Sequence, residues 1–315
     1  MKLIQYTCLV SLLFLSHAFA SGQTDSDVII SKDEIAQVLK NSQQAIQQHY
    51  IAPAKVERIT NAIGARQKLA KFQQDIPFAR LKQELEHVLI SASGDSSFEI
   101  KRREMLSNDS DNEHFPSAIQ TQILDNNIGM LSITGDLTYF GVEHDISVAM
   151  GYLQSVDGLI IDLRNAGSGT LKAAIYLMNY LLEADTVLSD ITYGNNQSER
   201  IFSTNPSTNA LKKQPSVYVL TSSFVAGTWE FFTYTLKHLN AATVVGEDTM
   251  GVGRMTTAIS MSENVRLVLA YAETKHPITS DNWQSVGVIA EYQTNAAQSE
   301  DVAYRMLLEQ LKPQP

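Results

Sequence analysis

The hydroxyls best placed for chemistry lie where an apolar segment changes into a helical pattern. The run Val217–Leu220 is β-branched and aromatic, which favours a buried strand, and Thr221-Ser222-Ser223 ends it. From Gly227 the apolar residues follow helical spacing. A nucleophile is often held at such a turn, because free N–H groups at a helix N-terminus stabilise developing negative charge. Ser222 and Thr228 are therefore candidate nucleophiles, although neither has an evident base.

A second turn of the same kind follows the strongest strand pattern of the chain. Residues 158–161 are apolar and lead into Asp162-Leu163-Arg164, which predicts a buried strand at 158–164; Gly167 and Gly169 lie in the segment that follows it. Such glycines also suit a plain strand–helix turn. The Gly-x-Gly spacing matches no dinucleotide-binding motif, so a phosphate-binding loop is disfavoured.

Metal and cofactor chemistry finds no support in the sequence. Six histidines follow the first 20 residues, and none has metal-ligand spacing such as His-Glu-x-x-His. The only cysteine is Cys8, which leaves no cysteine chemistry after residue 20. We expect no metal and no cofactor.

Strands alternating with helices indicate an α/β protein with a helical N-terminal part. Residues 31–100 carry three helical patterns, about 32–46, 54–72 and 78–91, and Ser31 with Glu34 predicts a capping box. Residues 101–121 are charged and polar, which predicts an exposed loop. Residues 122–315 form the predicted core, with strands at 128–133 and 158–164, helices at 140–153, 171–182 and 299–311, a polar excursion at 194–214 and a hairpin at 254–270.

The N-terminal residues are typical of a secretory signal peptide. Lys2 is a brief basic start, Cys8–Leu15 is an apolar centre, and Ala18-Phe19-Ala20 is a small-x-small cleavage site. Polar residues interrupt the short apolar run, which disfavours a membrane anchor and hence stable membrane insertion. We expect residues 1–20 to be the signal peptide, residues 21–30 a linker, and the protein to be periplasmic or secreted.

The charge of the chain excludes one class of partner. The formal net charge is −10 at pH 7, and the basic residues do not cluster. Proteins that bind nucleic acid present basic patches to the phosphates, so we expect no nucleic-acid partner.

Four motifs in order resemble the tail-specific (C-terminal processing) serine protease family. They are Thr221–Glu230, the strand at 158–164, Val244–Gly253 and Pro277–Val288. The region around residues 101–121 has no room for the PDZ domain of the typical proteases. The closest resemblance is therefore to the branch of interphotoreceptor retinoid-binding protein. The resemblance covers about residues 32–295 and implies a ClpP/crotonase-like α/β core with an N-terminal helical subdomain.

The resemblance also assigns catalytic positions, and each holds a residue unsuited to the role. The nucleophilic Ser falls on Gly227, the general-base His on Ser97, the orienting Glu on Gln284, and the catalytic Lys of the PDZ-bearing branch on Val252. The segment Ser93–Phe98, which contains Ser97, is equally consistent with a plain turn into a strand. The family's oxyanion hole implies backbone N–H donors at Gly167, Gly169 and Thr228.

Three functions remain open from the sequence. The first is a member without catalytic residues that binds an extended peptide or an apolar small molecule in its cleft. The second is an active serine or threonine hydrolase with a relocated nucleophile, Thr228 or Ser222. The third is an adaptor whose important surface lies elsewhere, such as the loop at 101–121.

Overall fold

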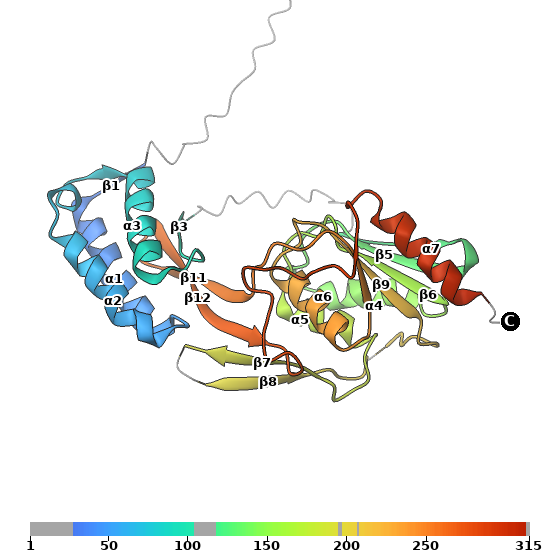
Figure 1. Cartoon of the computed structure of the whole chain (residues 1–315). Coiled ribbons are helices and arrows are strands. Elements are labelled where there is room, and N and C mark those ends of the chain that lie inside the picture. The colour runs from blue at the N-terminus through green and yellow to red at the C-terminus, as the bar shows by residue number, and fades with distance from the viewer. Residues whose placement is uncertain (1–27, 104–117, 195–196, 207, 313–315) are drawn as a thin grey trace, which may run out of the picture.

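A computed structural model describes residues 28–103, 118–194, 197–206 and 208–312. Three helices form an N-terminal subdomain, and a long hairpin joins it to an α/β core (Figure 1). Residues 1–27, which include the expected signal peptide, and most of the predicted loop at 101–121 lie outside the described residues.

The N-terminal subdomain consists of helices whose ends are set by capping residues. The Ser31 hydroxyl accepts a hydrogen bond from the Glu34 amide at the start of α1, Pro53 occupies the first turn of α2, and Gly94 ends α3 with φ 68°. The elements are β1 (Ile29–Ile30), α1 (Lys32–His49), α2 (Pro53–Gln67), η1 (Ala70–Phe72), β2 (Ile76–Pro77) and α3 (Phe78–Ser93).

An antiparallel sheet completes the core of this subdomain. Its order is β11-β12-β7-β8, and β3 pairs with β12. Val265, Leu267 and Leu269 of β12 are fully buried against the helices, so the buried face of the hairpin belongs to the N-terminal core. The strands are β3 (Glu99–Arg102), β7 (Val187–Tyr193), β8 (Ser198–Phe202), β11 (Arg254–Ser260) and β12 (Val265–Lys275).

The C-terminal core is built on a six-stranded sheet in the order β13-β10-β9-β6-β5-β4. All of its pairings are parallel except that of β4 with β5. The strands are β4 (Ile119–Leu124), β5 (Ile128–Ile133), β6 (Gly158–Asp162), β9 (Ser216–Thr221), β10 (Thr243–Gly246) and β13 (Tyr292–Gln293); η2 (Asp125–Asn127) links β4 to β5.

Helices cover both faces of this sheet, which explains the uninterrupted apolar runs of its central strands. Val217 and Val219 of β9 face one layer, whereas Tyr218 and Leu220 face the other. The first layer contains α4 (Val142–Tyr152), α5 (Leu171–Met178) and α6 (Thr228–His238), and the second contains α7 (Ser299–Leu311). The predicted α/β core with an N-terminal helical subdomain is confirmed.

Several sequence expectations need correction. The predicted polar excursion at 194–214 contains β8, an exposed strand paired with β7, and its lack of a buried face removed the alternating pattern that indicates a strand. The ends of the predicted loop at 101–121 belong to β3 and β4. Glu34 does not complete a capping box, because its carboxylate accepts hydrogen bonds from Ser262 and Asn264. Among the described residues, no helix is long and apolar enough to span a membrane.

Candidate functional site

Two adjoining cavities lie beside the carboxyl ends of the central parallel strands. The inner cavity has a volume of about 300 Å³ and is lined by Gly169, Gly227 and Thr228, which follow β6 and β9. The outer cavity has a volume of about 700 Å³ and lies between the N-terminal subdomain, represented by α3 and β3, and the loop before β11. Val252, Arg254 and Thr256 line both. In open α/β sheets this edge is where ligands bind.

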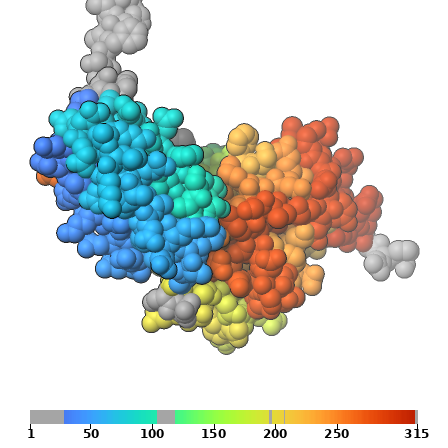
Figure 2. All heavy atoms as spheres, turned by 60° about the vertical axis from the view of Figure 1, so that its left-hand side comes forward, coloured from blue at the N-terminus to red at the C-terminus, as the bar shows by residue number. Residues whose placement is uncertain are grey.

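The structure brings the four family positions of the sequence to these cavities. Gly227 and Val252 line the inner cavity, and Ser97, Val252 and Gln284 line the outer one. These residues come from four separate segments of the chain. The N-terminal subdomain and the C-terminal part of the chain meet here, and Figure 2 shows the two in contact along a long seam.

Gly227 occupies a sharp strand-to-helix turn. Its φ is 56° and its ψ is −110°, a combination that side-chain-bearing residues adopt only with strain. A strained turn between a strand and a helix is also the place where a nucleophile is presented in other hydrolase folds. A Cβ built on Gly227 would meet no atom within 4 Å, so the space in front of the turn is open.

The Glu230 carboxylate holds this turn together with the loop that follows β10. Glu230 is fully buried and accepts hydrogen bonds from the amides of Gly227 (2.9 Å), Gly251 (2.6 Å) and Val252 (2.7 Å). The Thr249 hydroxyl donates a further bond of 2.5 Å. Four donors compensate for the burial of the charge, and the two loops are thereby fixed relative to each other.

Two backbone amides point to an oxyanion-binding geometry. Within the described residues, the amides of Gly169 and Thr228 have no hydrogen-bond acceptor, and both residues line the inner cavity. The Gly167 amide donates to the Gly135 carbonyl at 3.1 Å, so the expectation that Gly167 supplies a donor is wrong. Gly167 is instead needed for space, because a Cβ there would lie 2.2 Å from Asp136 Oδ1.

The two candidate hydroxyl nucleophiles donate to backbone carbonyls. Thr228 Oγ1 lies 2.7 Å from the Gly169 carbonyl oxygen, and Ser222 Oγ lies 2.8 Å from that of Arg164. Ser222 is buried and lines a different cavity, next to Glu247 and Phe224. A carbonyl cannot take a proton as a general base does, so neither hydroxyl has the partner that activation requires.

Ser97 belongs to a buried polar network. Its hydroxyl donates to Asp95 Oδ1 at 2.7 Å, while Tyr50 and Arg254 approach Asp95 Oδ2 at 2.8 and 2.6 Å. Burial raises the pKa of Asp95, but the hydrogen bonds from Ser97 and Tyr50 and the charge of Arg254 hold it below its ordinary value. Burial, followed by the hydrogen bond to Asp95, raises the pKa of Tyr50.

Gln284 and Trp283 support the backbone between the two cavities. Gln284 Oε1 accepts a hydrogen bond from the Gly253 amide at 2.9 Å, and Trp283 Nε1 donates to the Val252 carbonyl at 2.8 Å. The hydrogen bond from the Gly253 amide therefore requires an acceptor oxygen on the side chain at position 284, but it does not require a negative charge there.

Several residues of the site were missed from the sequence. The sequence places Arg254 only in a hairpin, Asp95 only in a turn and Glu230 only in a family motif. Their contacts could not be predicted, because buried charged groups that meet partners from distant segments leave no local pattern in the sequence. The histidines of the described residues lie outside both cavities. His276 is buried beside His238, with a ring-centroid distance of 5.6 Å, and burial, followed by His238, lowers its pKa to about 4.

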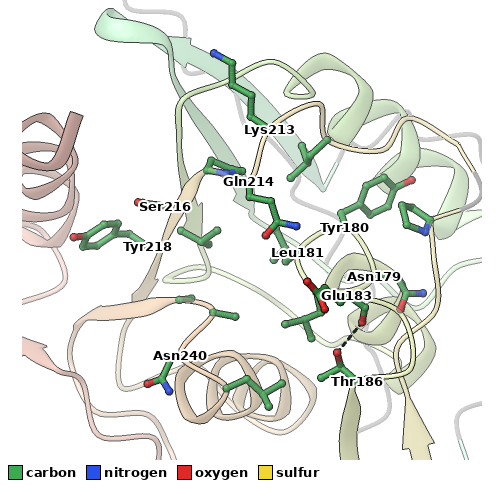
Figure 3. A pocket seen from close by; sticks show the side chains of 18 of the residues that line it. Asn179, Tyr180, Leu181, Glu183, Thr186, Lys213, Gln214, Ser216, Tyr218 and Asn240 are labelled. Carbon is green, nitrogen blue, oxygen red and sulfur yellow. Dashed lines mark hydrogen bonds between the residues drawn. The ribbon is translucent and has the colours of Figure 1, made fainter. Parts of the chain in front are cut away.

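The described residues contain no metal-ligand cluster, and they line a further cavity away from the four family positions. The described residues contain no group of three or more His, Cys, Asp or Glu that could hold a metal ion. This further cavity, with a volume of about 820 Å³, lies at the amino ends of β9 and β10, at the opposite edge of the sheet (Figure 3). Glu183, Gln214 and Asn240 line it.

The amides of Gly169 and Thr228, in the turns after β6 and β9, form a pair of donors of the kind that acyl-transfer enzymes use to bind an oxyanion. Residues 127–294 match the sequence profile of peptidase family S41. The chain belongs to this family, as its motifs predicted.

Individual relatives support the assignment over part of their length. A probable CtpA-like serine protease of Staphylococcus epidermidis is 26% identical over 151 residues, which are 47% of this chain and 30% of the relative. A carboxyl-terminal-processing protease of Synechocystis sp. is 29% identical over 124 residues, 39% of this chain and 28% of the relative. The matches thus span less than a third of these relatives.

Solved structures show the same fold over most of the chain. A lipoprotein from Streptococcus agalactiae superposes with a TM-score of 0.63 and 16% identity, covering 90% of this chain and 98% of that one. The photosystem II D1 C-terminal processing protease also gives a TM-score of 0.63, with 12% identity and coverage of 84% and 93%.

Proposed function

We propose that this chain is an exported member of peptidase family S41 that binds an extended peptide or an apolar ligand in its cleft without cleaving it. The observation that carries the proposal is Gly227. It stands at the strained turn where the family's nucleophile is expected, and it has no side chain that could attack a carbonyl.

The neighbouring positions support the same proposal. Ser97, Val252 and Gln284 line the cleft at the places where the family motifs imply an acid–base residue. None of them can take a proton near neutral pH. Loss of a whole catalytic triad typically reduces turnover on the order of a million-fold, and the residual rate comes from binding and the oxyanion donors.

The cleft itself favours a ligand with apolar side chains. Leu171, Phe231 and Trp283 line the inner cavity, and Met250 and Val252 are exposed at the outer one. Apolar groups that remain exposed beside polar backbone donors are a common feature of ligand sites.

Covalent labelling tests the absence of an activated hydroxyl. The purified chain is incubated with a fluorophosphonate and, separately, with a β-lactone, and the adduct is sought by mass spectrometry. We expect no labelling of Thr228 or Ser222, because both hydroxyls donate to carbonyls. A stoichiometric adduct on either residue, lost in Thr228→Val or Ser222→Ala, would identify a hydrolase with a relocated nucleophile.

Export rests on the N-terminal pattern of Lys2, the apolar run Cys8–Leu15 and Ala18-Phe19-Ala20. Mass spectrometry of the protein recovered from outside the cytoplasm is expected to show a chain that begins at Ser21. Recovery of the uncut chain in the cytoplasm alone would contradict export.

A further inference from the structure

β4 is the outermost strand on one side of the six-stranded sheet, and one of its edges faces away from β5. The Thr134 amide donates to the Ala118 carbonyl, so every second residue from 118 onward bonds to β5. The backbone N–H and C=O groups of Thr121 and Ile123 therefore point to the free edge, and they have no partner among the described residues. A row of such groups is a template for pairing with another strand.

This edge lacks the features by which proteins block unwanted strand pairing. Residues 119–124 read Ile-Gln-Thr-Gln-Ile-Leu, without lysine, proline or any charged residue. The pairing of β4 with β5 runs without a bulge, and the Ile123 side chain is 43% exposed. Since exposed edges are normally protected by charge, proline or bulges, an unprotected one indicates a strand that is covered by a partner.

The sequence of β4 identifies the partner, because it reads the same in both directions around Thr121. In an antiparallel pair with a two-fold axis at this residue, Thr121 lies opposite Thr121 of the second copy. Gln120 then lies opposite Gln122, and Ile119 lies opposite Ile123. Pairs of threonines and of β-branched residues stabilise antiparallel sheets, and the outward backbone groups of Thr121 suit a pair that exchanges two hydrogen bonds.

The charge distribution also permits a second copy at this edge. The formal net charge of −10 opposes association of two copies in general. β4 carries no charge, and Asp125 follows it four positions from the two-fold centre. The two Asp125 carboxylates would be separated by about eight residues of strand, or roughly 27 Å, well beyond the Debye length of about 8 Å at physiological ionic strength.

Helix α4 extends the apolar surface beside the edge. It contacts β4, and on one flank Ser147 and Gly151 face Asn209. Val148 and Tyr152, further round the helix, are 57% and 58% exposed. A two-fold axis perpendicular to the joined sheet would bring the α4 helices of the two copies onto the same face, where these side chains gain cover.

We propose that two copies of this chain associate through β4, antiparallel about Thr121, and so join their six-stranded sheets into one continuous sheet. The two-fold axis reverses the strands of the second copy. The candidate clefts, which lie beside the carboxyl ends of the parallel strands, therefore stand at opposite edges of the joined sheet and both stay open.

Paired charge substitutions test both the interface and its register. Gln120 and Gln122 are exposed, and in the proposed pair each faces the other across the axis. The variant Gln120→Lys, Gln122→Lys places like charges opposite each other twice, and we expect it to weaken dimerisation about tenfold or more. The matched control Gln120→Lys, Gln122→Glu carries as many new charges but pairs opposite ones, so it should dimerise at least as well as the wild type.

Sedimentation velocity of the purified chains measures the association, with concentrations from about 1 to about 100 µM. The wild type is expected to show a monomer–dimer equilibrium. A third variant, Gln120→Glu, Gln122→Glu, should be as weakly associated as the double-lysine variant. An equimolar mixture of these two should form a heterodimer, because every charge then meets its opposite. Unchanged thermal unfolding of each variant shows that the fold is retained.

Each contrary result would overturn the inference. A wild type that remains monomeric at about 100 µM would exclude a dimer through this edge. Equal dimerisation of the double-lysine variant and the Lys–Glu variant would place the interface elsewhere. Weakened association in every variant, without recovery in the mixture, would exclude the register centred on Thr121. None of these outcomes bears on ligand binding in the cleft, so the proposed function is tested separately.

Discussion

Oε2 of the Glu230 carboxylate accepts hydrogen bonds from the amides of Gly227 at 2.9 Å and Val252 at 2.7 Å, and Oε1 accepts one from the Gly251 amide at 2.6 Å. One buried side chain thus positions the turn before α6 and the loop before β11. Glu230 occupies the place of the family's motif glutamate, and its role in this chain is to hold the walls of the inner cavity in register.

Replacement of this carboxylate should be costly. In Glu230→Gln an NH₂ group takes the place of one acceptor oxygen and faces amide donors, so we expect the free energy of unfolding to fall by about 3 kcal/mol. Urea unfolding followed by circular dichroism measures the loss. Glu309→Gln, an exposed substitution on α7, is the control and should change stability by less than about 0.5 kcal/mol. Similarly small losses of stability in both variants would show that the Glu230 carboxylate does not hold the two loops together.

The Asp95 network should make stability depend on pH in the acidic range. The pKa of Asp95 is lowered in the folded protein, so its charge contributes stability above the unfolded pKa of about 3.9, and this contribution is lost as the pH falls through the folded value. Asp95→Asn is expected to cost about 2 kcal/mol at pH 7 and less at pH 3. Urea unfolding at both values checks this, and an equal cost at the two would contradict it.

His276 should give stability a second dependence on pH. In this case the folded protein favours the neutral form of the group, whereas for Asp95 it favours the charged form. Its folded pKa of about 4 lies below the ordinary value, so the unfolded chain binds more protons between pH 4 and pH 6.5. Stability is expected to rise with pH across this window by up to about 3 kcal/mol, with a smaller part from His238, whose pKa burial also lowers. In His276→Gln the slope should largely disappear. Parallel profiles for the variant and the wild type would exclude His276 as the cause.

Tryptophan fluorescence should report on occupancy of the inner cavity. The chain has two tryptophans; Trp283 lines the cavity, and Trp229 Nε1 donates to the Gly167 carbonyl beneath it. We expect a bound peptide with apolar side chains to shift or quench the emission, and Trp283→Phe to remove most of that change. Saturable binding of a fluorescein-labelled peptide without any change in tryptophan emission would place the ligand elsewhere.

The sequence predicted the parts of the fold that have strong periodicity. The strand predicted at 158–164 is observed at Gly158–Asp162, and its residues 159–161 are all apolar because both of its faces are covered. The helix at 299–311 has the bounds that its spacing indicates. β8 escaped prediction because an exposed edge strand has no buried face. The sequence also did not predict that β12 packs in the N-terminal core, because packing between segments more than 150 residues apart leaves no local signal.

The sequence indicated which residues to look for at the site, but it did not indicate the contacts that they make. The family motifs singled out Ser97, Gly227, Val252 and Gln284, which the structure places around two adjoining cavities. They could not show that the Gly167 amide is occupied or that Arg254 reaches Asp95, because both depend on where distant backbone segments meet.

Hydrolysis of a quenched, disordered protein substrate is the most direct test of the central claim. The wild type is compared with Gly227→Ser and with the triple variant Ser97→His, Gly227→Ser, Gln284→Glu, each checked for unaltered folding. The account predicts an inert wild type and measurable cleavage by the triple variant, since the cleft and the oxyanion donors are retained. Cleavage by the wild type that Thr228→Val or Ser222→Ala abolishes would contradict it.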